Sequence, residues 1–136
     1  MEIQMYLHFS GQCEAALSYY QKHLGAKTLF MMRFKDSPSG AETPPDWQNK
    51  IIHATFDIDG THIMASDGMP GKANKEPHGF SLSVNPDSAA EAERIFKALS
   101  DNGQVTMPLQ PTFFAAKFGM LIDQFDIPWM VHLEKD

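Results

Sequence analysis

The sequence runs twice through the same pattern, and this repetition constrains the fold more than any other feature. In the first half, Met1 to Phe9 has the alternation of a strand, and Ala15 to Leu24 has the apolar stripe of an amphipathic helix. In the second half, Gly79 to Asn85 and Ser88 to Leu99 repeat that pair. Four pairs of matching residues lie 75 positions apart: Phe9 and Val84, Ala15 and Ala90, Tyr20 and Ile95, Leu24 and Leu99. The repetition predicts two similar half-sheets with a pocket between them.

Three more strand-like runs follow each helix and complete the repeated unit. They are Lys27–Phe34, Ile51–Ile58 and His62–Asp67 in the first half, and Gln104–Met107, Phe114–Asp123 and Ile127–Glu134 in the second. Asp59-Gly60 predicts a tight hairpin, and Pro108 is expected to end its strand. The sequence therefore predicts an α+β fold in one domain, 1–136, built from two tandem modules over about 1–67 and 78–136.

Two irregular segments interrupt the modules. Asp36 to Asn49 contains three prolines and predicts a mobile loop near the mouth of the pocket, with Trp47 as its anchor. Gly68 to Pro77 is rich in Gly and Pro and is interpreted as the linker between the modules.

Composition limits the function classes. The 136 residues are 43% hydrophobic, enough for one packed core. A net charge of −6 with 11 scattered Lys and Arg residues argues against nucleic acid and anionic membrane surfaces as partners. Cys13 is the single cysteine, and no apolar run approaches the roughly 20 residues of a membrane span. Nor does the N-terminus have the pattern of a signal peptide. We therefore expect a cytoplasmic protein.

Alternation along the strands separates two faces of each sheet. The face covered by a helix is expected to carry apolar residues such as Leu7, Ile52 and Phe56. The opposite face is polar and rich in His, and it becomes a ligand-sized cavity if it curves inward. The candidate ligand-binding residues on that face are Gln4, Tyr6, His8, His53, His62, Met64, Ser66, Met130 and His132.

Several segments resemble PhnB-like proteins of the vicinal oxygen chelate superfamily, which includes glyoxalase I, bleomycin-resistance proteins and extradiol dioxygenases. The opening Tyr6–Gly11, the run Ile63–Asp67, and above all Phe113–Phe125 with Ile127–Met130 carry this similarity. The resemblance implies paired βαβββ modules with curved mixed sheets, as in glyoxalase and bleomycin-resistance proteins, and a homodimer. Some relatives carry a demethylubiquinone methyltransferase label, but no glycine-rich loop for a nucleotide-like cofactor is present.

The resemblance also implies where a divalent metal would bind in the superfamily's enzymes. Its ligand positions fall on Gln4, on Met64 or the neighbouring Ser66, on Gly79 and on Met130. Thioether sulfur and glycine are poor partners for Mg²⁺, Zn²⁺ or Fe²⁺. We therefore expect no metal at this position. A displaced site made by His8, His53 and His62 is the alternative.

Three functions remain open from the sequence, and whether the chain is an enzyme is left undecided. The favoured hypothesis is a small-molecule-binding protein without the usual metal. The alternatives are a metal-dependent lyase, isomerase or dioxygenase-like enzyme that uses a rearranged His site, and an accessory dimer without a ligand. Cys13, near a helix start, is expected to be a buried, inert thiol rather than a nucleophile.

Overall fold

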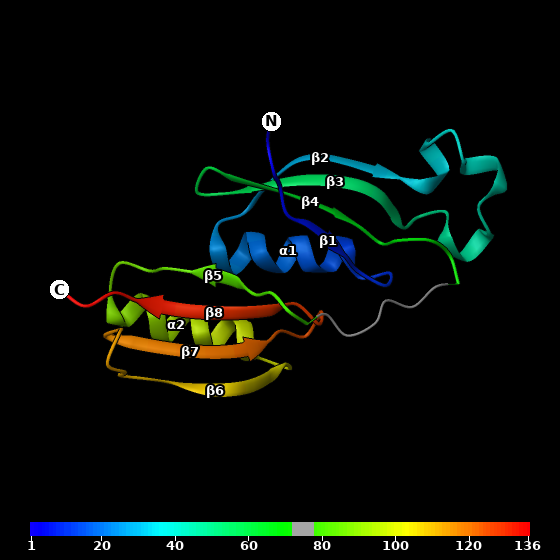
Figure 1. Cartoon of the computed structure of the whole chain (residues 1–136). Helices are drawn as coiled ribbons and strands as arrows, with labels where there is room; N and C mark the ends of the chain where they lie inside the picture. Colours follow the sequence, from blue (N-terminus) through cyan, green and yellow to red (C-terminus); the bar gives the residue numbers. More distant parts are fainter. Residues whose placement is uncertain (72–77) are drawn as a thin grey trace. The chain divides into compact units, whose positions relative to one another are not determined.

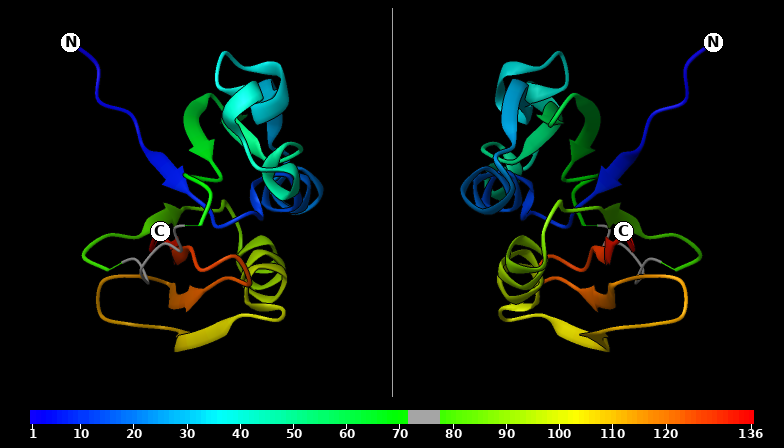
Figure 2. Two further views of the ribbon diagram at one scale, coloured as in Figure 1. Left: turned by 90° about the vertical axis from the view of Figure 1, so that its right-hand side faces the viewer. Right: turned by 90° about the vertical axis from the view of Figure 1, so that its left-hand side faces the viewer.

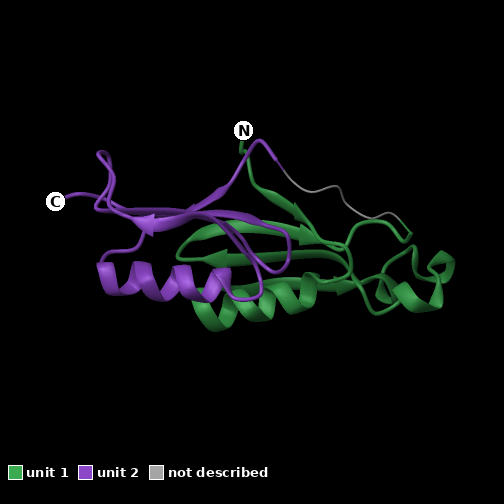
Figure 3. Cartoon of the chain, turned by 90° about the horizontal axis from the view of Figure 1, so that it is seen from below, with its two compact units in different colours: residues 1–75 green, residues 76–136 purple. Residues whose placement is uncertain are grey.

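The computed structural model describes residues 1–71 and 78–136. The chain forms two compact units, Met1–Lys75 and Glu76–Asp136, each built from one four-stranded sheet and one long helix (Figures 1 and 3). Within each unit, the helix lies against one face of its own sheet (Figure 2). No helix in the described ranges is long and apolar enough to cross a membrane.

The two units have the same topology. Unit 1 contains β1 Tyr6–His8, α1 Cys13–Leu24, β2 Lys27–Arg33, β3 Ile51–Ile58 and β4 Thr61–Ser66. Unit 2 contains β5 Leu82–Val84, α2 Ala89–Ser100, β6 Gln104–Gln110, β7 Lys117–Ile122 and β8 Pro128–Leu133. The sheet orders are β1-β4-β3-β2 and β5-β8-β7-β6. In each sheet the first strand is parallel to its neighbour and the other pairs are antiparallel. The predicted pair of mixed βαβββ sheets is confirmed.

Local sequence signals set the helix ends and the hairpin. Gly25 ends α1 in the left-handed conformation, with φ 69°, and its N–H donates to the Tyr20 carbonyl. Ser88 caps α2, because its side-chain oxygen accepts from the Glu91 N–H at 3.2 Å. Asp59 and Gly60 turn the β3–β4 hairpin with φ values of 47° and 92°, as the dipeptide predicts.

Several strand lengths differ from the predictions, and the strand expected over Phe114–Asp123, for example, is Lys117–Ile122. The strands expected over Met1–Phe9 and Gly79–Asn85 shrink to three residues each, Tyr6–His8 and Leu82–Val84. In contrast, β6 runs on through Pro108 to Gln110. It is an edge strand of its sheet, where a proline can be accommodated without losing a ladder hydrogen bond.

One residue of β3 lies on a different face from the predicted one. His53 pairs with Met32 and Ile51 pairs with Arg33, so Ile52 is an extra residue between two ladder positions. Ile51 is consequently buried on the core side, with 0% of its surface exposed. Ile52 is half-buried and lines the cavity described below. The prediction that it packs under the helix is wrong.

The long β2–β3 connection is braced by hydrogen bonds. It contains three 3₁₀ helices, Phe34–Asp36, Gly40–Glu42 and Pro45–Trp47. The Gln48 side-chain amide donates to the carbonyls of Gly40 and Thr43 at 2.8 and 2.7 Å. The composition predicts an irregular loop here, and the structure instead has short helical turns. Most of the predicted linker, 72–77, lies outside the described residues.

Candidate functional site

The face of the unit 1 sheet that α1 leaves uncovered carries a row of polar rings. The Tyr6 ring stacks on His8 with centroids 4.9 Å apart, and the Tyr6 hydroxyl lies 2.9 Å from His53 Nδ1. Burial raises the pKa of the Tyr6 phenol. Tyr6 therefore keeps its proton at neutral pH, and the direction of its hydrogen bond with His53 Nδ1 follows from the imidazole tautomer.

A cavity of about 530 Å³ opens at one end of this face. It belongs to unit 1 alone. Its walls come from β1, β3 and β4, from the β2–β3 connection, and from the residues that follow β4. They are formed by His8, Phe34, Ser39, Glu42, Thr43, Pro44, Ile52, Ser66, Gly68, Met69 and Pro70. The volume falls within the range of small-molecule pockets in proteins.

Two side chains tie the loop wall of the cavity to the rest of unit 1. The Trp47 indole N–H donates to the Gly68 carbonyl at 3.2 Å, so the loop is joined to a residue of the opposite wall. The Lys50 ammonium donates to the Gly11 carbonyl at 2.9 Å. The end of the β2–β3 connection that leads into β3 is therefore fixed by hydrogen bonds. These bonds agree with the anchoring role expected for Trp47.

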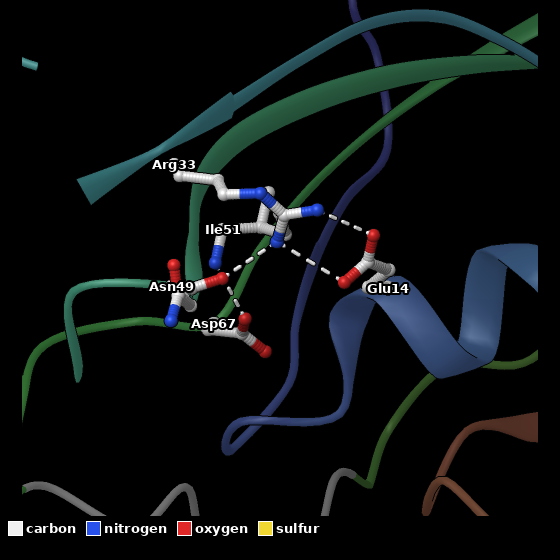
Figure 4. A network of polar contacts seen from close by, with 5 residues as sticks. All are labelled: Glu14, Arg33, Asn49, Ile51 and Asp67. Atoms are coloured by element: carbon white, nitrogen blue, oxygen red, sulfur yellow. Dashed lines mark hydrogen bonds and ion pairs between the residues drawn. The ribbon is translucent and has the colours of Figure 1, made fainter. Parts of the chain in front are cut away.

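The base of this connection rests on a buried carboxylate and an exposed ion pair (Figure 4). Asp67 is 1% exposed and accepts from the backbone N–H groups of Cys13 and Ile51 at 2.7 and 2.8 Å. The Arg33 guanidinium binds both Glu14 carboxylate oxygens, at 3.1 and 2.6 Å, and the Asn49 carbonyl at 2.7 Å. The start of α1, the end of β2 and the start of β3 are thus held together.

The same contacts shift two pKa values. The hydrogen bond from Arg33 lowers the pKa of the Glu14 carboxyl. Burial raises the pKa of the Cys13 thiol, and the nearby Asp67 adds to the effect. Cys13 is 0% exposed, so it is a protonated, inaccessible thiol, in agreement with the expectation of an inert cysteine.

The corresponding face of unit 2 carries several thioethers and aromatic rings. Met120 pairs with Met107 on one side and with Met130 on the other. Three methionines therefore lie side by side on the adjacent strands β6, β7 and β8. The His132 ring stands edge-on to Phe114 and Phe118, with centroids 6.0 Å away in each case. Its Nε2 is buried and has no hydrogen-bond partner among the described residues.

The candidate residues divide between different places. His8 and Ser66 line the cavity, and Tyr6 and His53 continue from His8 along the same sheet face. The others lie elsewhere. Gln4 precedes β1, is exposed, and donates to Glu2 at 2.7 Å. Met64 lies on the sheet face beside Tyr6. His62, at the start of β4, has its Nε2 3.3 Å from Asp57. Met130 and His132 belong to unit 2.

Several cavity residues were missed by the sequence reasoning. Phe34, Glu42 and Met69 lie in or beside irregular segments, where apolar and polar residues do not alternate. The sequence therefore does not show which way their side chains point. Ile52 was missed because the extra residue in β3 reverses its face. The proline-rich composition of 36–49 predicted only that this loop lies near the pocket.

The residues that the family resemblance assigns to the superfamily's metal position include few ligand types suited to a hard divalent ion. The donors are the Gln4 amide, the Met64 thioether or Ser66 hydroxyl, Gly79 and the Met130 thioether, with no carboxylate or imidazole. Nor do His8, His53 and His62 gather, since the described part of the chain has no group of three His, Cys, Asp or Glu side chains placed to hold a metal.

Comparison with known proteins identifies relatives along the whole chain. Residues 1–132 match the family described as 3-demethylubiquinone-9 3-methyltransferase. Protein YjdN of Escherichia coli is 38% identical over 144 aligned positions, which cover 99% of this chain and 97% of YjdN. The crystal structure of protein PA1353 from Pseudomonas aeruginosa has 44% identity and a TM-score of 0.85, covering 99% of this chain and 100% of PA1353.

Two further structures relate the chain to named groups. The putative 3-demethylubiquinone-9 3-methyltransferase, PhnB protein, from Bacillus cereus is 25% identical with a TM-score of 0.81, covering 98% and 99% of the two chains. A glyoxylase/bleomycin resistance protein/dioxygenase domain from Frankia shares the fold at 17% identity and a TM-score of 0.64, covering 100% of this chain and 93% of that domain. The chain is therefore a PhnB-like member of the 3-demethylubiquinone-9 3-methyltransferase family, with the fold of the glyoxalase/bleomycin-resistance superfamily.

Proposed function

We propose that this PhnB-like protein binds a small organic molecule in the cavity of unit 1 without using a metal at the superfamily's usual position. The observation that carries the proposal is the cavity itself, about 530 Å³ in volume and walled by both apolar and hydrogen-bonding side chains. Apolar walls with a few placed polar groups are the usual make-up of a ligand site. His8 and Ser66 supply hydrogen-bonding groups at the sheet end of the cavity, and Phe34 and Ile52 supply apolar surface.

The methyltransferase chemistry in the family's name has no support in the architecture. Both sheets are mixed and four-stranded. The connection from β1 to α1, the described segment Phe9–Gln12, contains one glycine and is not a glycine-rich phosphate-binding turn. The enzyme alternative with a rearranged His site is not favoured either, because His62 pairs with Asp57 at the start of β4, away from His8 and Ser66 at its end.

Two further parts of the proposal concern assembly and location. Edge strands β2 and β6 expose apolar side chains, with Leu29 54%, Phe30 46% and Val105 45% exposed. Covering them against a second copy supports a homodimer. A monomeric mass in light scattering at micromolar concentration would overturn the proposed homodimer.

The single, buried Cys13 is compatible with a reducing, cytoplasmic setting.

Fluorescence can test binding in the cavity, because Trp47 and Trp129 are the two tryptophans. In a Trp129→Phe background, Trp47 alone reports on the loop wall. Neutral Nile red should quench Trp47 and gain emission with a saturable 1:1 isotherm. Ser39→Phe, which narrows the cavity, should weaken this binding about tenfold or more. Ser18→Phe, on the exposed side of α1, is the matched control and should leave it unchanged.

The same assay tests the independence from metal. Dialysis against EDTA should leave the Nile red isotherm unaltered, and elemental analysis should find no stoichiometric divalent ion. The proposal is wrong if Ser39→Phe and Ser18→Phe bind the dye equally well. Its metal-free part is wrong if the protein holds one equivalent of Zn²⁺ or Ni²⁺ that Gln4→Ala removes.

A further inference from the structure

The cavity of unit 1 has an unbalanced charge. Of its eleven lining residues, Glu42 carries the formal charge, and none is Lys or Arg. His8 is the other titratable side chain on the walls. Since the whole chain has a net charge of −6, the field around it also disfavours anions. Among the described residues, the cavity therefore offers a carboxylate and no fixed cation to an incoming molecule.

Glu42 is exposed, and no ion pair to it is found among the described residues. A carboxylate that already had an Arg or Lys partner would be neutralised and would contribute little to a ligand. A carboxylate on a cavity wall with its charge uncompensated attracts a positive group.

The turn that carries Glu42 is held in place by packing and hydrogen bonds, so the position of the Glu42 backbone on the cavity wall is well defined. A Cβ on Gly40 would lie 2.6 Å from the Lys35 carbonyl oxygen, so the turn is packed tightly against the preceding helix. The Thr43 hydroxyl donates to the Ser39 carbonyl at 2.8 Å. Together with the two bonds from Gln48, these contacts fix the turn that carries Glu42.

The rest of the wall is suited to an apolar body. Phe34 is 4% exposed, and Ile52 turns into the cavity because it is the extra residue of β3. Pro44 and Pro70 add rigid apolar surface. A ligand that satisfies both parts of the wall has a positive group at one end and an apolar group at the other.

We propose that the ligand of this cavity is an organic monocation, an amine with an apolar body, whose ammonium group lies against the Glu42 carboxylate. The apolar body contacts Phe34 and Ile52, and His8 and Ser66 remain for a further hydrogen bond. This inference rests on the proposed function and names the ligand class of the same site. An anionic ligand, such as a phosphonate or carboxylate, would meet the Glu42 charge without a compensating cation on the described walls.

Three probes of one shape and different charge test the inference: benzylamine, benzyl alcohol and benzoate. Binding is followed by the backbone amide NMR shifts of Gly40, Glu42 and Thr43 at neutral pH and low salt. Benzylamine should bind about three- to fivefold more tightly than benzyl alcohol, the range of a partly exposed ion pair, and benzoate should bind most weakly. Added salt should reduce the preference for the amine.

Glu42→Gln should abolish the preference for benzylamine and leave the affinity for benzyl alcohol unchanged. Asp46→Asn removes a charge from the same loop outside the cavity wall and should preserve the preference. Equal binding of amine and alcohol, or a preference that survives Glu42→Gln, overturns the inference while leaving a small-molecule site intact. If neither Nile red nor any of the three probes perturbs the cavity, the proposed function fails as well.

Discussion

Unit 1 and unit 2 share a topology but differ in what their open sheet faces and connections carry. In unit 1 Tyr6 contacts both His8 and His53 on this face, and in unit 2 the matching face has a row of three methionines. The difference in connections is larger. From Arg33 to Ile51 the chain makes three 3₁₀ helices, whereas from Gln110 to Lys117 it makes a short loop. Both units therefore have the same sheet, and the long β2–β3 connection of unit 1 adds the walls that enclose its cavity.

Each unit also contains one well-bonded buried Asp, used for a different purpose. Asp67 joins the start of α1 to the start of β3, and so supports the base of the cavity loop. Asp123 is 3% exposed and accepts from the N–H groups of Phe125, Ile127 and the Trp129 indole, so it fixes the β7–β8 hairpin. Buried Asp side chains therefore support the base of the cavity loop in one unit and a hairpin turn in the other.

The largest expected effect comes from removing these carboxylates. Asp67→Ala and Asp123→Ala each leave buried donors without their acceptor, so each should lower the free energy of unfolding by about 2–5 kcal/mol in urea titrations. Exposed Asp136→Ala is the control and should change it by less than about 0.5 kcal/mol. Of the folded variants, only Asp67→Ala should also weaken Nile red binding. Equal loss of dye binding in both would contradict the division of roles between the units.

A second effect is confined to unit 2, where helix and sheet approach closely at Gly119. A Cβ there would lie 2.5 Å from Phe96 Cε1 and 2.9 Å from Leu109 Cα. Gly119→Ala should therefore cost about 1–3 kcal/mol by overpacking, measured by thermal unfolding. Adding Phe96→Leu should recover part of the loss, because it removes one of the two clashes. A fully stable Gly119→Ala would show that the Phe96 ring and the β6 backbone at Leu109 both yield to the added Cβ, contrary to this prediction.

The smallest effect concerns the ion pair at the base of the unit 1 loop. Because Arg33 lowers the pKa of Glu14, the pair stabilises the fold above the ordinary carboxyl value of 4.5, and this contribution is lost as the pH falls through the lowered pKa. Both side chains are solvated, so Glu14→Gln should cost below about 1 kcal/mol at neutral pH.

The cost of Glu14→Gln should disappear in acid, where wild type and variant become alike in urea titrations. The pair Glu91–Arg94 in unit 2 lies within one helix and its loss should leave the loop-dependent Nile red binding unaffected. A pH-independent cost of Glu14→Gln would show that the side chain acts through packing rather than charge.

Elements with a strong local signal were predictable from the sequence. The bounds of β3 match the prediction. As expected, Gly25 ends α1, Ser88 caps the start of α2, and Asp59-Gly60 forms the hairpin turn. Edge strands β1 and β5 were predicted too long because the alternation in the sequence extends beyond the residues that pair with the neighbouring strand. Pro108 was interpreted as a stop because its position at a sheet edge was not known.

The sequence by itself determined the duplicated plan, the order of helices and strands, and the family. These depend on residue types and on spacing along one segment at a time. Tertiary structure decided that Ile52 faces the cavity, that Trp47 reaches Gly68, and that Glu42 lines the cavity beside residues of the sheet. Those outcomes depend on register between strands and on hydrogen bonds between distant backbone groups, which no local pattern encodes.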